Sequence, residues 1–206
     1  IDCGFLHPCV DKTEYSAHIE GVENPYTDSI AMQYVVTIGT ANWAKGSMEV
    51  VSMLSGTGLS LAHVGGGQAK ELEILKLHAK NHDVKLWVAP KLSSDQLSTL
   101  IKDSLAVVSM AHKEPFGLTP IEAFSIGTPA IFVADGGFVD SIIDGESGRL
   151  ISRSSITEWH NALNQAKSEN TRQIWAKNGK QRIVELKLTP LEPVSYTHLR
   201  AHETIA

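Results

Sequence analysis

The alternation of short apolar runs with segments of helical periodicity constrains the fold more than any other feature. Six runs of strand length, several of them rich in β-branched residues, are each followed by a segment that suits a helix. This is the pattern of βαβ units, whose helices cover both faces of a parallel sheet. The sequence therefore predicts an α/β fold with a doubly wound, Rossmann-like parallel sheet. The expected strands are 34–39, 59–64, 84–88, 105–110, 130–133 and 150–151.

The helices are expected where apolar residues recur every three or four positions and where capping residues mark an end. Ser93 or Ser94 is the expected cap of a helix that ends at Lys102. The other expected helices are 44–55, 68–80, one from 120 onward, 139–143, 155–166 and 170–186. Four large apolar residues are expected to anchor the last two helices in the core: Trp159, Leu163, Trp175 and Ile183.

The strongest indication of a ligand site comes from the stretch 114–123, EPFGLTPIEA. It joins the apolar run 105–110 to a helix, where a βα unit of an open sheet presents its ligand. Gly117 permits a turn that other residues resist and lets backbone amides approach a partner closely. Thr119 is the expected N-cap and Pro120 the first helical residue, so free N–H groups and the positive dipole end face this position. The sequence therefore predicts an anion site, with phosphate as the usual anion.

Two carboxylates flank these amides. Glu114 precedes the turn and Glu122 follows it, with seven residues between them. Carboxylates accept hydrogen bonds from hydroxyls but repel phosphate, so the pair fits a nucleotide-sugar, which has hydroxyl-rich groups at both ends of its phosphates. Two simpler interpretations stay open. Thr119 and Glu122 are spaced as a capping box, and Glu114 before Pro115 also fits a solvated loop acid that the proline holds extended.

These residues resemble a known family. The stretch 114–123 is similar to the E-x7-E signature, in its form E-P-F-G-L-x-x-x-E-A, of the retaining glycosyltransferases with the two-domain GT-B fold, in particular the group 1 family (glycosyltransferase family 4). The resemblance continues through 127–131 and 136–137 to 144–150, which is similar to the family's G-x-P and D-G-x-x-G-x-L patterns. It covers about residues 34–185 and implies the C-terminal, donor-binding half of a GT-B fold.

The resemblance also implies roles for these residues. Glu114 would hold the donor hexose and Glu122 the ribose hydroxyls, and Phe116 belongs to the same donor-binding turn. The diphosphate would be held by Lys45 and by the amides of Gly117, Leu118 and Thr119. Retaining enzymes of this kind are thought to react on one face of the sugar, with the leaving phosphate taking the acceptor's proton. No metal, cofactor or protein base is therefore implied.

The loop 39–46, GTANWAKG, resembles the family's G-R-x-x-x-x-K-G loop. Gly39 and Thr40 would line the donor, and Lys45 would neutralise its phosphates as a point charge. Without the resemblance, Lys45 fits a solvated lysine in a first helical turn equally well. Thr40 stands where the family usually has arginine. Losing one of two cations would weaken diphosphate binding or leaving-group stabilisation. This puts catalytic competence in doubt more than it does the fold.

Glycines and histidines elsewhere have simpler interpretations. The run 65–67, three glycines, predicts a tight strand-to-helix turn, with lining of the nucleotide pocket as the alternative. His78 and His82 stand at i, i+4, a spacing that can hold zinc, but no third ligand follows at a useful spacing, so no metal site is expected. His112 is expected near the site or on the surface, without an acid–base role.

Composition narrows the class of protein. With 206 residues, a net charge of -5 and no basic run, the chain fits one domain whose main partner is not a nucleic acid. No apolar segment approaches the length of a transmembrane helix. Cys3 and Cys9 have no later cysteines to pair with, so reduced thiols in a cytoplasmic protein are expected. Peripheral contact with a membrane would come through a missing domain.

The sequence divides the chain into three parts. Residues 1–33 are expected to be a remnant of the N-terminal domain with its hinge, since 7–11 is similar to the family's interdomain segment. Residues 34–190 form the expected nucleotide-sugar-binding domain. Residues 191–206 resemble translated cloning-vector or adapter sequence. Because Ile1 is not an initiator methionine, the N-terminal GT-B domain is expected to be missing.

Two functions follow. The first is the donor half of a retaining glycosyltransferase of the hexosyltransferase class, which binds a nucleoside-diphosphate sugar and transfers its glycosyl group to an unknown acceptor. Without the first domain, which holds most of the acceptor site in the family, this half is expected to bind the donor without useful turnover. The second is a non-catalytic nucleotide- or sugar-binding or interaction module on the same sheet, which Thr40 slightly favours. A response-regulator domain is set aside because no strand ends in an acidic cluster around a phosphoacceptor aspartate.

Overall fold

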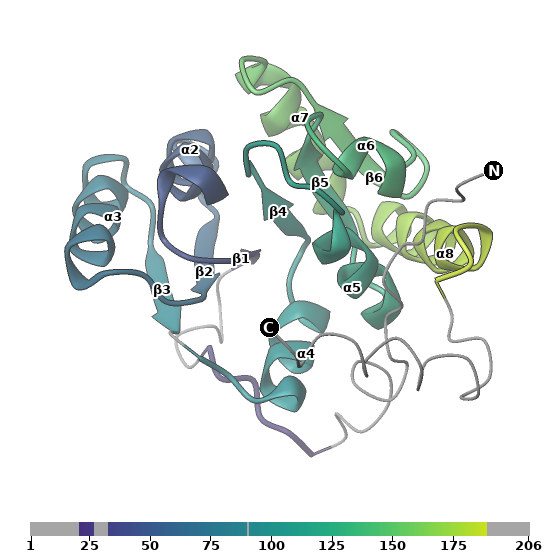
Figure 1. Ribbon diagram of the computed structural model, residues 1–206, viewed down its shortest axis with the longest axis horizontal. Helices are drawn as coiled ribbons and strands as arrows, with labels where there is room; N and C mark the ends of the chain where they lie inside the picture. Colours follow the sequence, from purple (N-terminus) through teal and green to yellow (C-terminus); the bar gives the residue numbers. More distant parts are fainter. Residues whose placement is uncertain (1–20, 27–32, 90, 189–206) are drawn as a thin grey trace, which may run out of the picture.

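The computed structural model describes residues 21–26, 33–89 and 91–188. Its centre is a six-stranded sheet in which neighbouring strands are parallel. The strand order is β3-β2-β1-β4-β5-β6 (Figure 1). The strands are β1 (Tyr34–Ile38), β2 (Ser60–Val64), β3 (Leu86–Ala89), β4 (Val107–Ser109), β5 (Ala130–Val133) and β6 (Gly148–Ile151). The doubly wound parallel sheet expected from the sequence is confirmed.

The strand order reverses at the middle of the sheet. From β1 the chain proceeds toward one edge through β2 and β3, and from β4 it proceeds toward the other edge through β5 and β6. The two central strands meet at Val36 and Val107, and the Val36 amide donates to the carbonyl of Ala106 at 3.1 Å. In open sheets of this kind, ligands bind beyond the carboxyl ends of the strands at such a reversal.

Helices cover both faces of the sheet. Helix α2 packs against α3 and α7, whereas α5 packs against α4 and α8, and Figure 1 shows these two groups on opposite sides of the strands. The helical elements are a 3-10 turn η2 (Trp43–Lys45), α2 (Ser47–Leu54), α3 (Ala69–Asn81), α4 (Ser94–Lys102), α5 (Leu118–Ile126), α6 (Phe138–Ser141), α7 (Ile156–Ala166) and α8 (Glu169–Glu185). Ser93 caps α4, as expected, by accepting from the amide of Gln96 at 3.2 Å.

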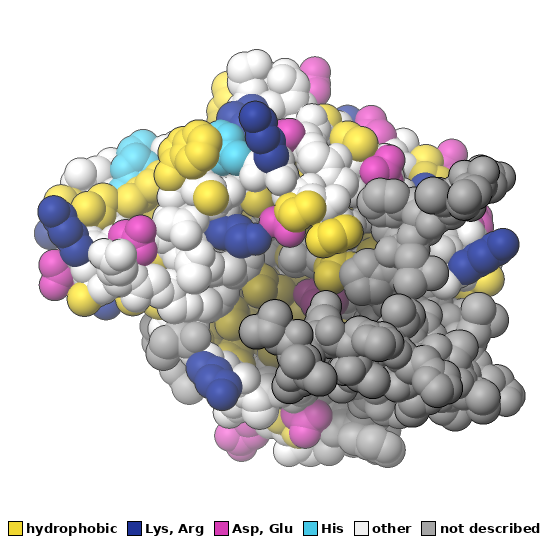
Figure 2. All heavy atoms as spheres, viewed as in Figure 1, with side chains coloured by type: hydrophobic (Ala, Val, Ile, Leu, Met, Phe, Trp, Pro, Cys, Tyr) yellow, Lys and Arg dark blue, Asp and Glu magenta, His cyan; other side chains and the backbone are white. Residues whose placement is uncertain are grey.

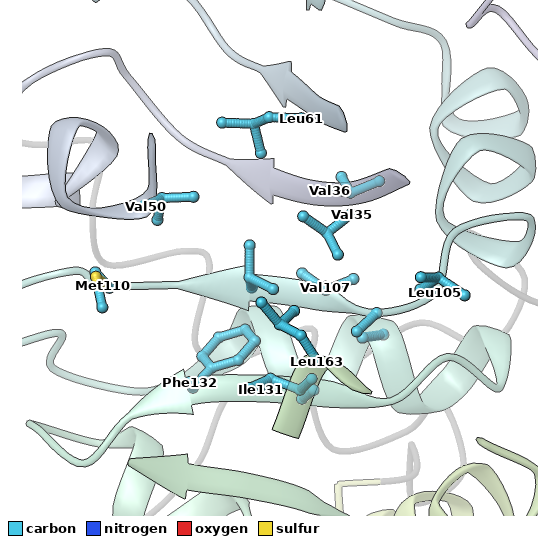
Figure 3. Packing of buried hydrophobic residues seen from close by; sticks show 14 of the residues in the cluster. Val35, Val36, Val50, Leu61, Leu105, Val107, Met110, Ile131, Phe132 and Leu163 are labelled. Atoms are coloured by element: carbon cyan, nitrogen blue, oxygen red, sulfur yellow. The ribbon is translucent and has the colours of Figure 1, made fainter. Parts of the chain in front are cut away.

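Branched and aromatic side chains from neighbouring strands form the centre of the core. Figure 3 shows them packed with Val50 of α2 and Leu163 of α7, and all are buried: Val35, Val36, Leu61, Val107, Ile131 and Phe132. Each such side chain stabilises the fold by roughly 1.5–3 kcal/mol relative to an exposed one. The four anchors expected for the last two helices are also buried, with Trp159 fully so and Ile183 the most exposed at 9%.

Several expected boundaries were wrong. The fourth strand was expected over 105–110 but spans Val107–Ser109, and the last was expected at 150–151 but begins at Gly148. Two further differences have a local cause. A single helix was expected over 44–55, but Gly46 has a φ of 66° and separates η2 from α2. The third strand was expected from Val84, but it begins at Leu86. The Val84 amide still donates to Ala79 of α3 at 2.9 Å, and Asp83 has a φ of 54°, so the chain is completing the end of α3 at the position where a strand was expected.

Several predictions lie outside the described residues. These are the reduced state of Cys3 and Cys9, the hinge at 7–11 and the adapter-derived tail at 191–206. The short described segment 21–26 packs on the domain: Tyr26 is fully buried, and its ring centroid lies 4.7 Å from that of Tyr34 and 5.7 Å from that of Trp87.

Candidate functional site

The loops that follow β1 and β4 leave the sheet side by side at the reversal of strand order. The amide of His112 donates to the carbonyl of Ala44 at 2.8 Å, which ties the two loops together. Gly46 is pressed against Met110 so closely that a Cβ would overlap the Met110 carbonyl. We call loops 39–46 and 110–117, together with the first turn of α5, the switch-point site.

An ion pair joins the two loops of this site. Nζ of Lys45 lies 2.7 Å from Oε2 of Glu114, although the two residues are 69 positions apart in the chain. The side chains are 40% and 22% exposed, so the pair is accessible and contributes little to stability, about 0–1 kcal/mol. The sequence placed both residues in one site, and the structure brings them into direct contact. An ammonium group has three donors, so Lys45 can hold Glu114 and still offer N–H groups to a ligand.

The start of α5 differs from the expectation. Thr119 was expected as the N-cap and Pro120 as the first helical residue, but the N-cap is Gly117, with φ 61° and ψ 44°, and the helix begins at Leu118. Gly117 has no side chain that could cap the helix, and the first amides of a helix lack intrahelical partners. Because Pro120 has no N–H, the amides of Leu118 and Thr119 are the donors of this turn. The Thr119–Glu122 capping box is therefore not formed, since Thr119 lies inside the helix.

Gly117 is required by packing. It is buried, and a Cβ there would lie 2.5 Å from the carbonyl oxygen of Gly137 and 2.9 Å from Oγ of Ser141. Ser141 donates to the carbonyls of both glycines, at 3.0 and 3.2 Å. The sequence attributed this glycine both to a turn that other residues resist and to the close approach of a ligand. Its positive φ confirms the turn and lets α5 begin at Leu118, and its missing side chain makes room for the β5–α6 loop. The approach of a ligand stays a prediction.

The remaining predicted residues lie in the same two loops and in α5. A Cβ at Gly39 would lie 3.1 Å from Cγ of Lys45, so the stem of the lysine crosses the glycine. Thr40 is exposed, and its Oγ1 accepts from Nδ2 of Asn42 at 2.8 Å. Phe116 is 44% exposed in the turn before α5. Glu122 lies in the second turn of α5 and is half-buried.

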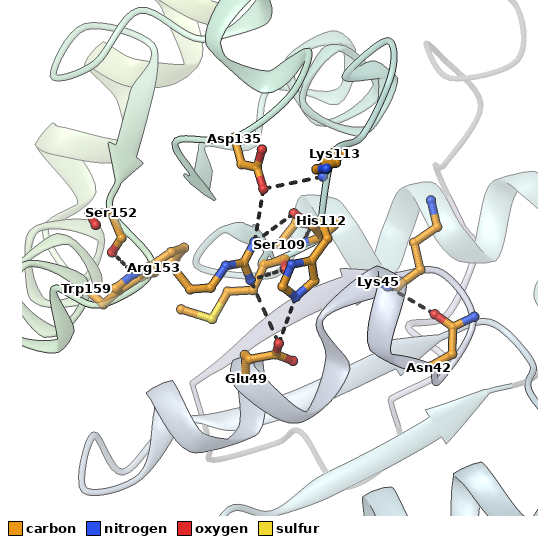
Figure 4. A network of polar contacts seen from close by, with 12 residues as sticks. Asn42, Lys45, Glu49, Ser109, His112, Lys113, Asp135, Ser152, Arg153 and Trp159 are labelled. Atoms are coloured by element: carbon orange, nitrogen blue, oxygen red, sulfur yellow. Dashed lines mark hydrogen bonds and ion pairs between the residues drawn. The ribbon is translucent and has the colours of Figure 1, made fainter.

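A polar network beside the ion pair was missed by sequence reasoning, apart from His112. Nε2 of His112 lies 2.9 Å from Oε1 of Glu49, and its ring stacks on Trp43 with the centroids 4.2 Å apart. Figure 4 shows Arg153 between Glu49 and Asp135, reaching the exit of β4 from the loop after β6. His112 therefore lies in the 110–117 loop next to this network, which agrees with the expected position near the ligand site. The sequence signal for Arg153 and Asp135 is only that each lies two residues beyond the end of a strand, so both emerge at the carboxyl edge of the sheet.

Exposed aromatic residues accompany the polar ones. Trp43 is 71% exposed, the largest fraction among the exposed large hydrophobic side chains of the described residues. Figure 2 shows histidine side chains beside hydrophobic ones, with basic and acidic side chains close by, on the side of the molecule where Figure 1 places α2 and α3. The surface around the switch-point site thus offers charges, hydrogen-bonding groups and aromatic faces together.

The expected turn at 65–67 is present, and Gly65 packs directly against the carbonyl of Gly39. His78 and His82 have ring centroids 4.1 Å apart, and Nε2 of His78 lies 2.8 Å from Oγ of Ser52. Within the described ranges, no group of three or more His, Cys, Asp or Glu residues is placed to hold a metal ion. None of the helices in those ranges is both long and apolar enough to cross a bilayer.

Comparison with known proteins assigns the family. The model of the family described as glycosyl transferases group 1 matches residues 31–182, about three quarters of the chain. The chain belongs to the group 1 glycosyl transferases. Its relatives include the D-inositol 3-phosphate glycosyltransferase of Mycobacterium tuberculosis, which is 34% identical over 74 residues. That match covers 36% of this chain but only 15% of the relative.

Solved structures of GT-B glycosyltransferases share the fold of this group 1 chain. Sucrose-phosphate synthase from Thermosynechococcus elongatus aligns with a TM-score of 0.73 and 21% identity, over 87% of this chain and 47% of that one. Anabaena Alr3699/HepE, solved in complex with UDP and glucose, aligns with a TM-score of 0.70 and 19% identity, over 86% of this chain and 52% of that one. The chain thus spans about half the length of these structures, and its Rossmann-like sheet corresponds to the C-terminal half of a GT-B fold.

Proposed function

We propose that this chain is the donor half of a retaining glycosyltransferase. It binds a nucleoside-diphosphate sugar at the switch-point site and transfers the glycosyl group to an acceptor that a further, N-terminal domain helps to bind. The observation that carries the proposal is the Lys45–Glu114 ion pair, 2.7 Å long, which joins the loops after β1 and β4 beside the first amides of α5. A cation, free amides and an acidic group then meet at the one edge of the sheet where such folds bind ligands.

Each part of the site has a task in this proposal. Lys45 and the amides of Leu118 and Thr119 receive the diphosphate, because a cation and the first amides of a helix suit an anion and both follow strands at the reversal of strand order. Glu114 accepts hydrogen bonds from the hexose, and Glu122 from the ribose hydroxyls. As the glycosidic bond breaks, negative charge grows on the departing diphosphate, and fixed donors stabilise that charge without reorganisation. This chain shares its fold with HepE, which was solved in complex with UDP and glucose. That complex supports a uridine nucleotide as the first probe.

Retention of configuration is proposed from the resemblance to the E-x7-E family. In that mechanism the leaving phosphate takes the acceptor's proton. No acid–base role is therefore proposed for His112, whose Nε2 lies 2.9 Å from Oε1 of Glu49. We further propose that neither a metal ion nor a cofactor takes part. The proposed boundaries are 34–190 for the donor domain, and the proposed location is the cytoplasm, with peripheral membrane contact through the N-terminal domain as the alternative.

A second function is supported by Thr40. Its side chain is occupied by Asn42 and carries no charge, so Lys45 lacks the second cation that the family usually has in this loop. A non-catalytic nucleotide- or sugar-binding module would keep donor affinity but show no turnover in the full-length protein. Turnover of a UDP-sugar by the full-length protein would exclude that function.

Calorimetry with UDP and UDP-glucose tests the donor site. We expect Lys45→Ala to weaken both ligands by about tenfold, because it removes a charge-assisted contact to phosphate. Glu114→Gln should weaken UDP-glucose relative to UDP, because only the sugar nucleotide carries the hexose. Lys102→Ala is the matched control: it removes one positive charge from an exposed lysine in the last turn of α4, at the opposite edge of the sheet. If the folded wild-type chain binds no member of a panel of uridine, guanosine and adenosine diphosphates, the proposal is wrong.

A further inference from the structure

Arg153 contacts the exit of β4 through two hydrogen bonds. Its Nη1 donates to the carbonyl of Met110 at 2.6 Å, and its Nη2 donates to the carbonyl of Ala111 at 3.1 Å. Both residues directly follow β4 and are buried, with 3% and 2% exposure. Buried carbonyls need a hydrogen-bond partner, and beyond the end of the strand the sheet no longer supplies one. Arg153 takes over that role for two successive peptide groups.

The carboxylates around Arg153 link it to the rest of the site. Nη2 lies 3.4 Å from Oδ2 of Asp135, and the same oxygen accepts from the amide of Lys113 at 3.4 Å. Nη1 lies 4.0 Å from Oε1 of Glu49, the oxygen that also contacts His112 (Figure 4). The guanidinium therefore connects four separate segments: the β4 exit, the β5 exit, α2 and its own loop after β6.

The clamped segment leads directly to Glu114. Met110 and Ala111 are held by Arg153, His112 by Ala44 and Glu49, and Lys113 by Asp135. The carbonyl of Glu114 then accepts from the amide of Gly137 at 2.6 Å. Each backbone position from the strand end to Glu114 is thus tied to a neighbouring element. The side-chain contact between Glu114 and Lys45 joins this segment to the loop after β1, so the position of the segment bears on where Glu114 lies.

We propose that Arg153 is a positioning residue of the donor site: it holds the segment 110–114 so that Glu114, Lys45 and the start of α5 face one ligand. This inference rests on the proposed function. Arg153 does not replace the arginine that the family usually has at the position of Thr40. The two terminal nitrogens of Arg153 are engaged by carbonyls, and its charge is compensated by Asp135 and Glu49. A lysine could not do the same task, since it has no planar fork that reaches two carbonyls and a carboxylate at once.

The test combines two measurements on the same variants. Arg153→Met removes the clamp with little change in side-chain length, and Arg153→Lys keeps only the charge. Arg149→Met is the matched control: Arg149 lies on β6, its side chain is similarly buried, and it forms an ion pair with Asp144 at 2.7 Å, which is shorter than either ion pair of Arg153. Hydrogen exchange reports the local opening of residues 107–118 without any ligand, and calorimetry reports the affinity for UDP.

We expect Arg153→Met to speed exchange in 107–118 by about tenfold or more, because two charge-assisted hydrogen bonds are lost, and to weaken UDP by about tenfold. Arg153→Lys should recover part of both effects, and Arg149→Met should leave both at wild-type values. Unchanged exchange in Arg153→Met overturns the clamp whether or not UDP binds. Faster exchange with unchanged UDP affinity overturns its link to the site. If the wild-type chain does not bind UDP, the result counts against both the proposed function and the link between the clamp and the donor site. The exchange data then still decide whether the clamp exists.

Discussion

Burial of His63 makes the stability of this domain depend on pH. His63 lies on β2 between Thr37 of β1 and Val88 of β3, and it is 1% exposed. Neither ring nitrogen has a hydrogen-bond partner among the residues that the structure describes. Desolvation lowers the pKa of His63 from 6.5 to about 4, because a buried imidazolium loses its hydration.

The sign of the effect follows from proton binding. Between pH 6.5 and about 4, His63 is protonated in the unfolded chain but neutral in the folded one, so the unfolded state binds more protons and stability falls as the pH falls. The stabilisation is fully present above pH 6.5. At 1.36 kcal/mol for each pH unit, the whole gap is worth about 3 kcal/mol, of which about 2 kcal/mol is lost by pH 5.

Urea denaturation at several pH values measures this effect, and a variant separates it from the titration of carboxylates. We expect His63→Leu to be at least as stable as the wild type at pH 7, since it removes two unpaired buried nitrogens, and to gain about 2 kcal/mol on the wild type between pH 7 and pH 5. Thr37→Val alters a neighbouring buried polar residue that does not titrate, so its difference from the wild type should be the same at every pH. A difference between His63→Leu and the wild type that stays constant over this range would refute the argument.

Two further predictions concern glycines. Gly46→Ala should destabilise the fold by several kcal/mol in thermal or urea denaturation, because its Cβ would overlap the carbonyl of Met110. Gly56 has a similar φ of 77° but faces open space, so Gly56→Ala should cost only about 1 kcal/mol. Equal losses in the two variants would contradict the packing explanation. Gly179→Ala would gain about 1 kcal/mol from helix propensity, but its Cβ would lie 2.5 Å from Cδ1 of Phe124, so we expect a net loss of about 1–3 kcal/mol. The double variant Gly179→Ala/Phe124→Leu should then cost less than the two single changes together, and strict additivity would argue against the contact.

The sequence located the candidate site but not its internal contacts. The stretch 114–123 and the loop 39–46 were both placed at strand ends, and the structure puts them side by side at the reversal between β1 and β4. The pairing of Lys45 with Glu114 could not be derived from either stretch alone, because it depends on the order of the strands. Arg153 was missed for the same reason: nothing local distinguishes an arginine that satisfies two distant carbonyls from one that is solvated.

The error at α5 has a comparable origin. Thr119 followed by Pro120 is a good local signal for a helix start, yet the helix begins at Leu118 because Gly117 adopts a left-handed conformation. Contact with Gly137 and Ser141 favours that conformation, and these residues belong to the next βα unit. A local capping preference of about 1 kcal/mol is outweighed by packing between units.

The sequence by itself determined the class of this protein: the alternation of strands and helices, the buried anchors of α7 and α8, and the two loops that carry the proposed ligand-binding residues. Those properties depend on periodicity and turn chemistry, which act over a few neighbouring residues. Only the tertiary structure decided that Lys45 pairs with Glu114 and that α5 begins at Leu118. It also decided that His63 is buried between two strands with no hydrogen-bond partner among the described residues. These depend on contacts between segments far apart in the chain, and such contacts exist only once the strand order has brought the segments together.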